Sequence, residues 1–303
     1  MRRPESPTRS ARRATVMLGA AGALLAVMSV VAHSQAANWE LVVLGIAQDA
    51  GIPQLRCFES PCSDIRAGRR KPEKVASVGV IDRTSGRAYL FDATPDMPAQ
   101  IHAFTGGRLP DGIFLTHAHI GHYTGLMYLG KESTAAQGMP VYATARMGDF
   151  LRTNGPWSLL VKDGNIALHT VQADTTLNLP GGLDVTPIAV PHREEFTDTV
   201  GYVIAGPRAR VLFVPDTDRW ETWSRSIREL ADQMDLVIVD GTFASASELK
   251  GRKIEEIPHP LMPVTRELVG GTRAKLWFIH LNHTNRELDT ATDVVREGQV
   301  FPI

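Results

Sequence analysis

Three histidines fall within six residues of the chain, in the string Thr116-His117-Ala118-His119-Ile120-Gly121-His122. The string follows the apolar run 112–115, which is typical of a buried strand. Side chains alternate along a strand, so His117 and His119 point the same way, and His122 can reach the same point from a following turn or helix. Neutral imidazole is a common ligand of zinc and similar divalent cations, so the spacing indicates metal chemistry. The alternative is a polar loop that is merely rich in histidine.

Three more potential metal ligands lie just beyond other apolar runs. They are His192 after the run 185–190, Asp216 after 211–214 and His280 after 276–279. A single histidine or aspartate in such a place is more often structural, because it caps a helix or binds a loop amide. Functional sites in layered α/β folds gather at the carboxyl ends of the strands, so the shared position of these residues indicates one metal centre.

The runs that precede these residues belong to a series of short apolar segments, most of them rich in β-branched residues and bounded by Gly, Pro, Asp or Asn. We predict strands over 41–46, 78–81, 88–91, 112–115, 141–143, 185–190, 201–204, 211–214, 236–239 and 276–279. Amphipathic stretches predict helices over 97–104, 220–234 and 263–269. Alternating strands and helices indicate one α/β or α+β domain over residues 37–303.

Residues 1–36 differ in composition from the rest of the chain. Five arginines precede an apolar run over 14–32, and small residues follow it, which is the pattern of a secretory signal peptide. The pair Arg12 and Arg13 leaves the twin-arginine route open. An uncleaved membrane anchor is the alternative, because the run is long enough to cross a bilayer. In either case we expect the domain to lie outside the cytoplasm, in the periplasm or secreted.

The overall charge argues against nucleic acid as a partner. The chain has 32 Lys and Arg against 33 Asp and Glu, a net charge of −1, and 43% of its residues are hydrophobic. Residues 1–36 hold five arginines and one glutamate, so their removal changes the net charge from −1 to about −5. We therefore expect a small-molecule substrate and no stable membrane association after signal cleavage. No feature of the sequence indicates an oligomeric state.

The chain has two cysteines, Cys57 and Cys62, both near the start of the predicted domain. A disulfide between them suits an oxidising compartment, although the loop that it closes is tight. Two free thiols or part of a metal site are the alternatives.

The motif His117-x-His119-x-x-His122, followed in order by His192, Asp216 and His280, resembles the metallo-β-lactamase fold superfamily. The resemblance spans essentially the whole predicted domain and implies a four-layer αββα sandwich with a hydrolytic site for one or two metal ions. Within the superfamily, the segments 45–54, 93–101, 239–242 and 279–285 resemble the pyrroloquinoline quinone biosynthesis protein B family.

The resemblance implies a role for each residue of the motif. It places His117, His119 and His192 around a first metal, His122 and His280 around a second, and Asp216 between the two. Gly121 stands where the superfamily usually has aspartate, which implies a weak second site, a single metal, or another ligand such as His283. The cysteine cluster of the closer family is reduced to Cys57 and Cys62, which favours the disulfide.

The remaining polar residues near strand ends have predicted roles around these ligands. His259 is the first candidate for the general acid that protonates a leaving group, on its match to phosphodiesterase relatives, and His283 is the second. The alternative for His259 is a helix-start residue without a catalytic role. Asp92 and Asp240 are predicted to orient ligand imidazoles rather than to bind metal.

Three functions agree with these features. The first is an exported metal-dependent hydrolase acting on an ester, lactone, amide or phosphodiester, with zinc as the expected metal and iron or manganese as alternatives. The second is a role in pyrroloquinoline quinone biosynthesis or handling, including metal-dependent oxidation, although an export signal does not suit cofactor assembly. The third is a non-catalytic metal-binding protein.

Overall fold

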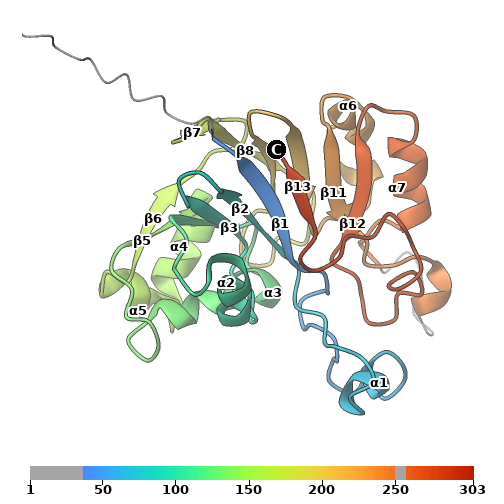
Figure 1. The fold of residues 1–303 in the computed structure, drawn as a ribbon, viewed down its shortest axis with the longest axis horizontal. Helices are drawn as coiled ribbons and strands as arrows, with labels where there is room; N and C mark the ends of the chain where they lie inside the picture. The colour runs from blue at the N-terminus through green and yellow to red at the C-terminus, as the bar shows by residue number, and fades with distance from the viewer. Residues whose placement is uncertain (1–36, 250–256) are drawn as a thin grey trace, which may run out of the picture. The chain divides into compact units, whose positions relative to one another are not determined.

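Two β-sheets face each other, and helices cover their outer sides (Figure 1). The computed structural model describes residues 37–249 and 257–303, which belong to one compact unit, Ala36–Ile303. The predicted signal peptide, residues 1–36, lies outside the described residues. Within the described ranges, every helix is too short or too polar to cross a bilayer.

The first sheet has the strand order β13-β1-β2-β3-β4-β5-β6. Its strands are β1 Trp39–Gly45, β2 Ser77–Asp82, β3 Ala88–Phe91, β4 Gly112–Phe114, β5 Met139–Ala143, β6 Ile166–Thr170 and β13 Val300–Pro302. The second sheet has the order β12-β11-β10-β9-β8-β7. Its strands are β7 Leu177–Leu179, β8 Leu183–Ala189, β9 Val200–Ala205, β10 Arg210–Val214, β11 Leu236–Asp240 and β12 Lys275–Ile279.

The helices are short and lie between strands along the chain. They are α1 Cys62–Arg66, α2 Met97–Thr105, α3 Ile120–Tyr123, α4 Ala145–Thr153, α5 Trp157–Lys162, α6 Ile227–Ala231 and α7 Met262–Val269, with 3₁₀ turns η1 Thr124–Leu129, η2 Trp220–Thr222 and η3 Ala246–Leu249. One core cluster lies between the sheets, and another joins the first sheet to α2, η1, α4 and α5. The predicted αββα sandwich is therefore confirmed.

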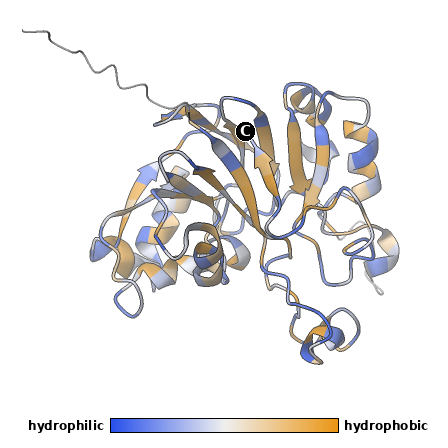
Figure 2. Ribbon diagram, in the orientation of Figure 1, coloured by the Kyte–Doolittle hydropathy of each residue, from blue (hydrophilic) through white to orange (hydrophobic). Residues whose placement is uncertain are grey.

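The central strands are strongly apolar because both of their faces are covered. All side chains of β2 and β3 are buried, and Figure 2 shows the strands mainly in the apolar colour. Aromatic rings fill the space between the sheets. The ring of Phe114 stacks on Tyr142 with centroids 4.4 Å apart and on Phe91 at 5.0 Å, and it meets the edge of Tyr202 at 5.6 Å.

The prediction of one continuous helix over 220–234 is wrong. The structure has the short turn η2, then an irregular stretch, and then α6, which begins after Ser226. The Ser226 side chain accepts a hydrogen bond from Glu229 N and so starts a new helix. The side chain of Trp220 donates to Thr265 Oγ1 at 2.8 Å and that of Trp223 to the Ala189 carbonyl at 2.9 Å. These tertiary contacts hold the segment away from helical geometry.

Candidate metal centre

Strand direction brings the predicted ligands together. The strand β1 lies antiparallel to β2, which is antiparallel to β3, and β3 is parallel to β4, so β1 and β4 end at the same edge of the first sheet. In the second sheet, β8, β10, β11 and β12 also run in one common direction. Two hydrogen bonds join the sheets beside the histidine motif: Val200 N donates to the Thr116 carbonyl at 3.1 Å and the Tyr202 hydroxyl to the Leu115 carbonyl at 2.5 Å.

Three histidines and one aspartate form a first cluster, His117, His119, His192 and Asp216, whose potential ligand atoms all lie within 4.8 Å of one another. Asp216 Oδ2 is 3.4 Å from His117 Nε2, 3.9 Å from His119 Nδ1 and 3.1 Å from His192 Nε2. Three imidazoles and a carboxylate at this spacing are a donor set typical of zinc.

A second cluster shares Asp216 and adds His122, His280 and Asp49. Asp216 Oδ2 lies 3.8 Å from the Nε2 atoms of both His122 and His280. The structure thus brings together all six residues predicted as metal ligands. The second cluster also contains Asp49, which we did not single out from the sequence. In the part of the chain that the structure describes, His283 belongs to neither cluster.

Each of the five imidazoles has its second nitrogen next to a separate partner. The partners are Thr116 Oγ1 for His117 (2.9 Å), Glu195 Oε2 for His119 (3.3 Å), Asp92 Oδ2 for His122 (2.7 Å), Asp218 Oδ1 for His192 (2.9 Å) and Thr242 Oγ1 for His280 (3.1 Å). Metal-binding histidines characteristically use their other ring nitrogen in this way, since the contact orients the ring and selects the tautomer.

Burial and neighbouring charges shift the pKa values of both the acids and the imidazoles in the clusters. Burial alone would raise the pKa of Asp216, but the imidazoles of His192 and His280 outweigh it and hold the pKa well below its usual range. Burial would lower the pKa of His192, but the carboxylates of Asp216 and Asp218 raise it to about 10. Burial keeps the pKa of His117 well below its ordinary value, which suits a neutral ligand.

His259 lies beside the clusters and in the wall of a cavity. Its Nδ1 is 2.8 Å from Asp240 Oδ2 and 3.3 Å from Asp216 Oδ1. The cavity has a volume of about 440 Å³ and is lined by polar and apolar residues from several loops: Gln48, Gln54, Arg193, Phe243, Ile257, Pro258, His259, Asn282 and His283. Both residues predicted as acids therefore face one cavity at the metal centre. Asp240 contacts His259 rather than one of the six predicted ligands.

Asp92 offers a test of ligand orientation. Its carboxylate contacts His122 Nδ1 at 2.7 Å and accepts from Thr116 N at 2.8 Å, and its backbone has a φ of 67°. Asparagine tolerates this left-handed conformation, so Asp92→Asn removes the charge without disturbing the backbone. We expect zinc binding at the His122 cluster to weaken about 10- to 100-fold. A calorimetric titration with zinc measures this affinity. Asp111→Asn is the control, because Asp111 lies at the starts of β3 and β4, away from the metal centre, and this variant should leave the affinity unchanged.

Sequence reasoning missed three carboxylates at this centre, Asp49, Glu195 and Asp218. Asp218 lies two residues after Asp216. Glu195 lies three residues after His192. The signal for Asp49 was its position: it follows β1, whose end lies at the same sheet edge as the end of β4.

Cys57 and Cys62 form a disulfide in the structure, with their Cα atoms 5.8 Å apart. The bond closes the segment that leads into α1, which extends from the edge of the sheets where β1 ends (Figure 1). Cys57 borders a cavity of about 580 Å³ that also includes His283 in its wall. The closed loop therefore shares the wall of this cavity with His283, which also lines the cavity beside His259.

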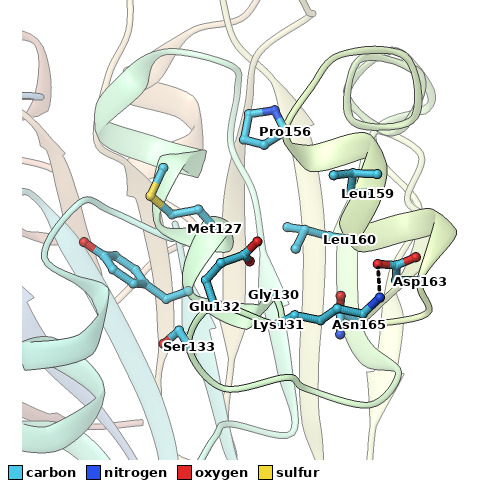
Figure 3. Close-up of a pocket in the computed structure, with 11 residues that line it drawn as sticks. Met127, Gly130, Lys131, Glu132, Ser133, Pro156, Leu159, Leu160, Asp163 and Asn165 are labelled. Atoms are coloured by element: carbon cyan, nitrogen blue, oxygen red, sulfur yellow. Dashed lines mark ion pairs between the residues drawn. The ribbon is translucent and has the colours of Figure 1, made fainter.

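A separate cavity of about 480 Å³ lies between η1 and α5, and Figure 3 shows the residues around it. Its wall is formed by apolar side chains such as Met127 and Leu159 and by the ion pair of Lys131 Nζ with Asp163 Oδ2 at 2.8 Å. None of the predicted site residues lines it. This cavity is therefore separate from the candidate metal centre.

Comparison with known proteins places this geometry in a family. A model of the β-lactamase superfamily domain matches residues 87–280, more than half of the chain. The chain belongs to the β-lactamase superfamily. The Coenzyme PQQ synthesis protein B of Ruegeria pomeroyi is 26% identical over 274 residues, which cover 81% of this chain and 90% of that protein.

Solved structures of the superfamily share the fold. Zinc-bound PqqB from Methylobacterium extorquens has a TM-score of 0.73 at 21% identity, covering 87% of this chain and 100% of that chain. A diphosphatase of the PhnP family has a TM-score of 0.64 at 21% identity, covering 88% and 97%. The fold is therefore the metallo-β-lactamase fold, and its buried histidines and aspartates fit a metal site.

Proposed function

We propose that the chain is an exported, zinc-dependent hydrolase that acts on an ester, lactone, amide or phosphodiester in the periplasm or outside the cell. The observation that carries the proposal is the pair of ligand clusters that share Asp216, next to His259 in the wall of a cavity. The basic and apolar pattern of residues 1–36 supports export.

Two clusters joined by one carboxylate are suited to hydrolysis. Bound divalent ions act as Lewis acids and make water nucleophilic near neutral pH. His117, His119 and His192 would hold one ion, and His122 and His280 the other, with Asp216 shared. Thr116, Asp92 and Asp218 fix the ring orientations and so preorganise the site.

The side chains that line the cavity would bind and protonate the substrate. Asp240 Oδ2 accepts from His259 Nδ1, which leaves Nε2 of His259 as the atom that gives a proton to the leaving group. Arg193 lines the cavity, and no aspartate or glutamate is found among its described lining residues. This charge favours an anionic substrate such as a phosphodiester.

Substrate screening tests the proposal. Chromogenic esters, lactones, β-lactams and phosphodiesters are assayed with zinc, manganese and iron, and we expect zinc-dependent turnover that His117→Ala abolishes. His102→Ala is the matched control, because His102 lies exposed on α2 and belongs to neither cluster. A His117→Ala protein with full metal content and full turnover would overturn the assignment.

Similarity to Coenzyme PQQ synthesis protein B favours a second candidate, metal-dependent oxidation in the formation or handling of a quinone cofactor. Elemental analysis of protein purified without added metal separates the two. Zinc supports hydrolysis, whereas a preparation that retains iron supports oxidation.

A further inference from the structure

Gly121 and Asp49 lie against each other at the second cluster. A Cβ atom on residue 121 would lie 2.5 Å from Asp49 Cα and would also collide with Asp49 Oδ1. Any side chain at position 121 would therefore displace the backbone of the segment that carries Asp49. The glycine in the histidine motif is thus a geometric requirement for the position of Asp49.

Backbone hydrogen bonds hold the Asp49 segment at the ends of both sheets. Gln48 N donates to the Leu281 carbonyl at 2.9 Å, and Leu281 N donates to the Ile46 carbonyl at 2.8 Å. Ala47 N also donates to the Lys74 carbonyl at 2.9 Å. The segment is therefore fixed next to His280, and Asp49 reaches the cluster from a well-supported position.

The polar atoms that face Asp49 have no hydrogen-bond partner. The side chains of His122 and His280 are fully buried, and the Nε2 atom of each has no hydrogen-bond partner. Asp49 Oδ1, which is also unpaired, lies 3.3 Å from the first atom and 3.8 Å from the second. Buried polar atoms without partners are costly, and a shared cation would satisfy all three at once.

We propose that Asp49 is the carboxylate ligand of a second divalent cation, in place of the aspartate that the histidine motif lacks at position 121. The ligand set of this site is Asp49, His122, His280 and the shared Asp216. The carboxylate comes from the segment after β1 instead of from the histidine motif, and Gly121 makes room for it. The second site is therefore complete, and the protein binds two zinc ions.

The proposal rests on the metal centre of the proposed function but not on hydrolysis, so a zinc count tests it separately. Metal-free full-length protein is titrated with zinc in a calorimeter, and the zinc retained after dialysis is measured by elemental analysis. We expect two equivalents for the wild type. Asp49→Asn keeps the size of the side chain but lacks the charge, and we expect it to retain one equivalent, with zinc binding at the second site at least about 100-fold weaker.

Two control variants make the result specific. Asp96→Asn carries the same change at a carboxylate that accepts from Val75 N at 2.8 Å, outside both clusters, and should keep two equivalents. His283→Ala should also keep two. Gly121→Ala should lose the second equivalent as Asp49→Asn does, because it displaces the Asp49 segment.

Two outcomes would overturn the proposal. One is an Asp49→Asn protein that binds two zinc ions as tightly as the wild type. The other is a wild-type protein that binds only one. A wild-type protein that binds two zinc ions but hydrolyses none of the substrates would instead count against the proposed function. The Asp49 site would still stand.

Discussion

Replacing Asp216 with asparagine is expected to lower zinc-dependent hydrolysis at least about 10³-fold, which corresponds to about 4 kcal/mol of activation free energy. Asp216 Oδ2 lies within 3.9 Å of nitrogens on all five clustered histidines. Asparagine preserves the shape of the side chain but removes the charge that both clusters share. The protein should therefore lose affinity at both metal positions together.

The measurement combines turnover with zinc content, so that a loss of turnover can be related to a loss of metal. Asp82→Asn serves as the control, since Asp82 is also buried but its carboxylate accepts hydrogen bonds from Ser85 and Asn38 in a turn away from the clusters. It should keep wild-type zinc content and turnover. An Asp216→Asn protein with two tightly bound zinc ions would contradict the shared-ligand role.

Replacing Phe114 with alanine is expected to lower the free energy of unfolding by about 3–5 kcal/mol. The Phe114 side chain is fully buried between the sheets, where its ring contacts Tyr142, Phe91 and Tyr202. Alanine leaves a cavity that these rigid aromatic rings cannot fill, so both the transfer free energy and the lost packing contribute.

Urea unfolding followed by circular dichroism measures this loss, with Phe58→Ala as the matched control. Phe58 is 79% exposed, so its truncation should change the free energy of unfolding by less than about 0.5 kcal/mol. Because β4 leads directly into His117, the Phe114→Ala protein should also bind zinc more weakly. Equal stability of the two variants would show that the ring cluster does not hold the sheets together.

Most strands that bear the site could be predicted from the sequence because their apolar runs are continuous. The run 88–91 coincides with β3, and the runs 211–214 and 276–279 differ from β10 and β12 by one residue each. Most side chains of these strands are buried, so their apolar runs are almost unbroken. The edge strands β6, β7 and β13 were missed, because their side chains are partly exposed and their apolar pattern is weak.

Helices were harder to predict than strands. The helices α4 and α5 pack on the first sheet through only a few buried residues, such as Leu151 and Leu160, and have no continuous apolar run. The stretch 220–234 has a helical pattern, but its buried tryptophans bind distant partners, Thr265 and Ala189. Tertiary contacts therefore outweighed the local preference.

The sequence by itself determined six of the side chains that can hold a metal and where along the chain they stand. The spacing of His117, His119 and His122 after a strand is a local property, and local geometry is enough to place the three side chains together. Only the tertiary structure decided which partner each ring nitrogen contacts and where Asp49 lies. Asp49 and Gly121 are far apart in the chain, and they meet because β1 and β4 end at one edge of the same sheet. Gly121 stands where the superfamily usually has a ligand, and its lack of a side chain leaves room for Asp49 from another segment.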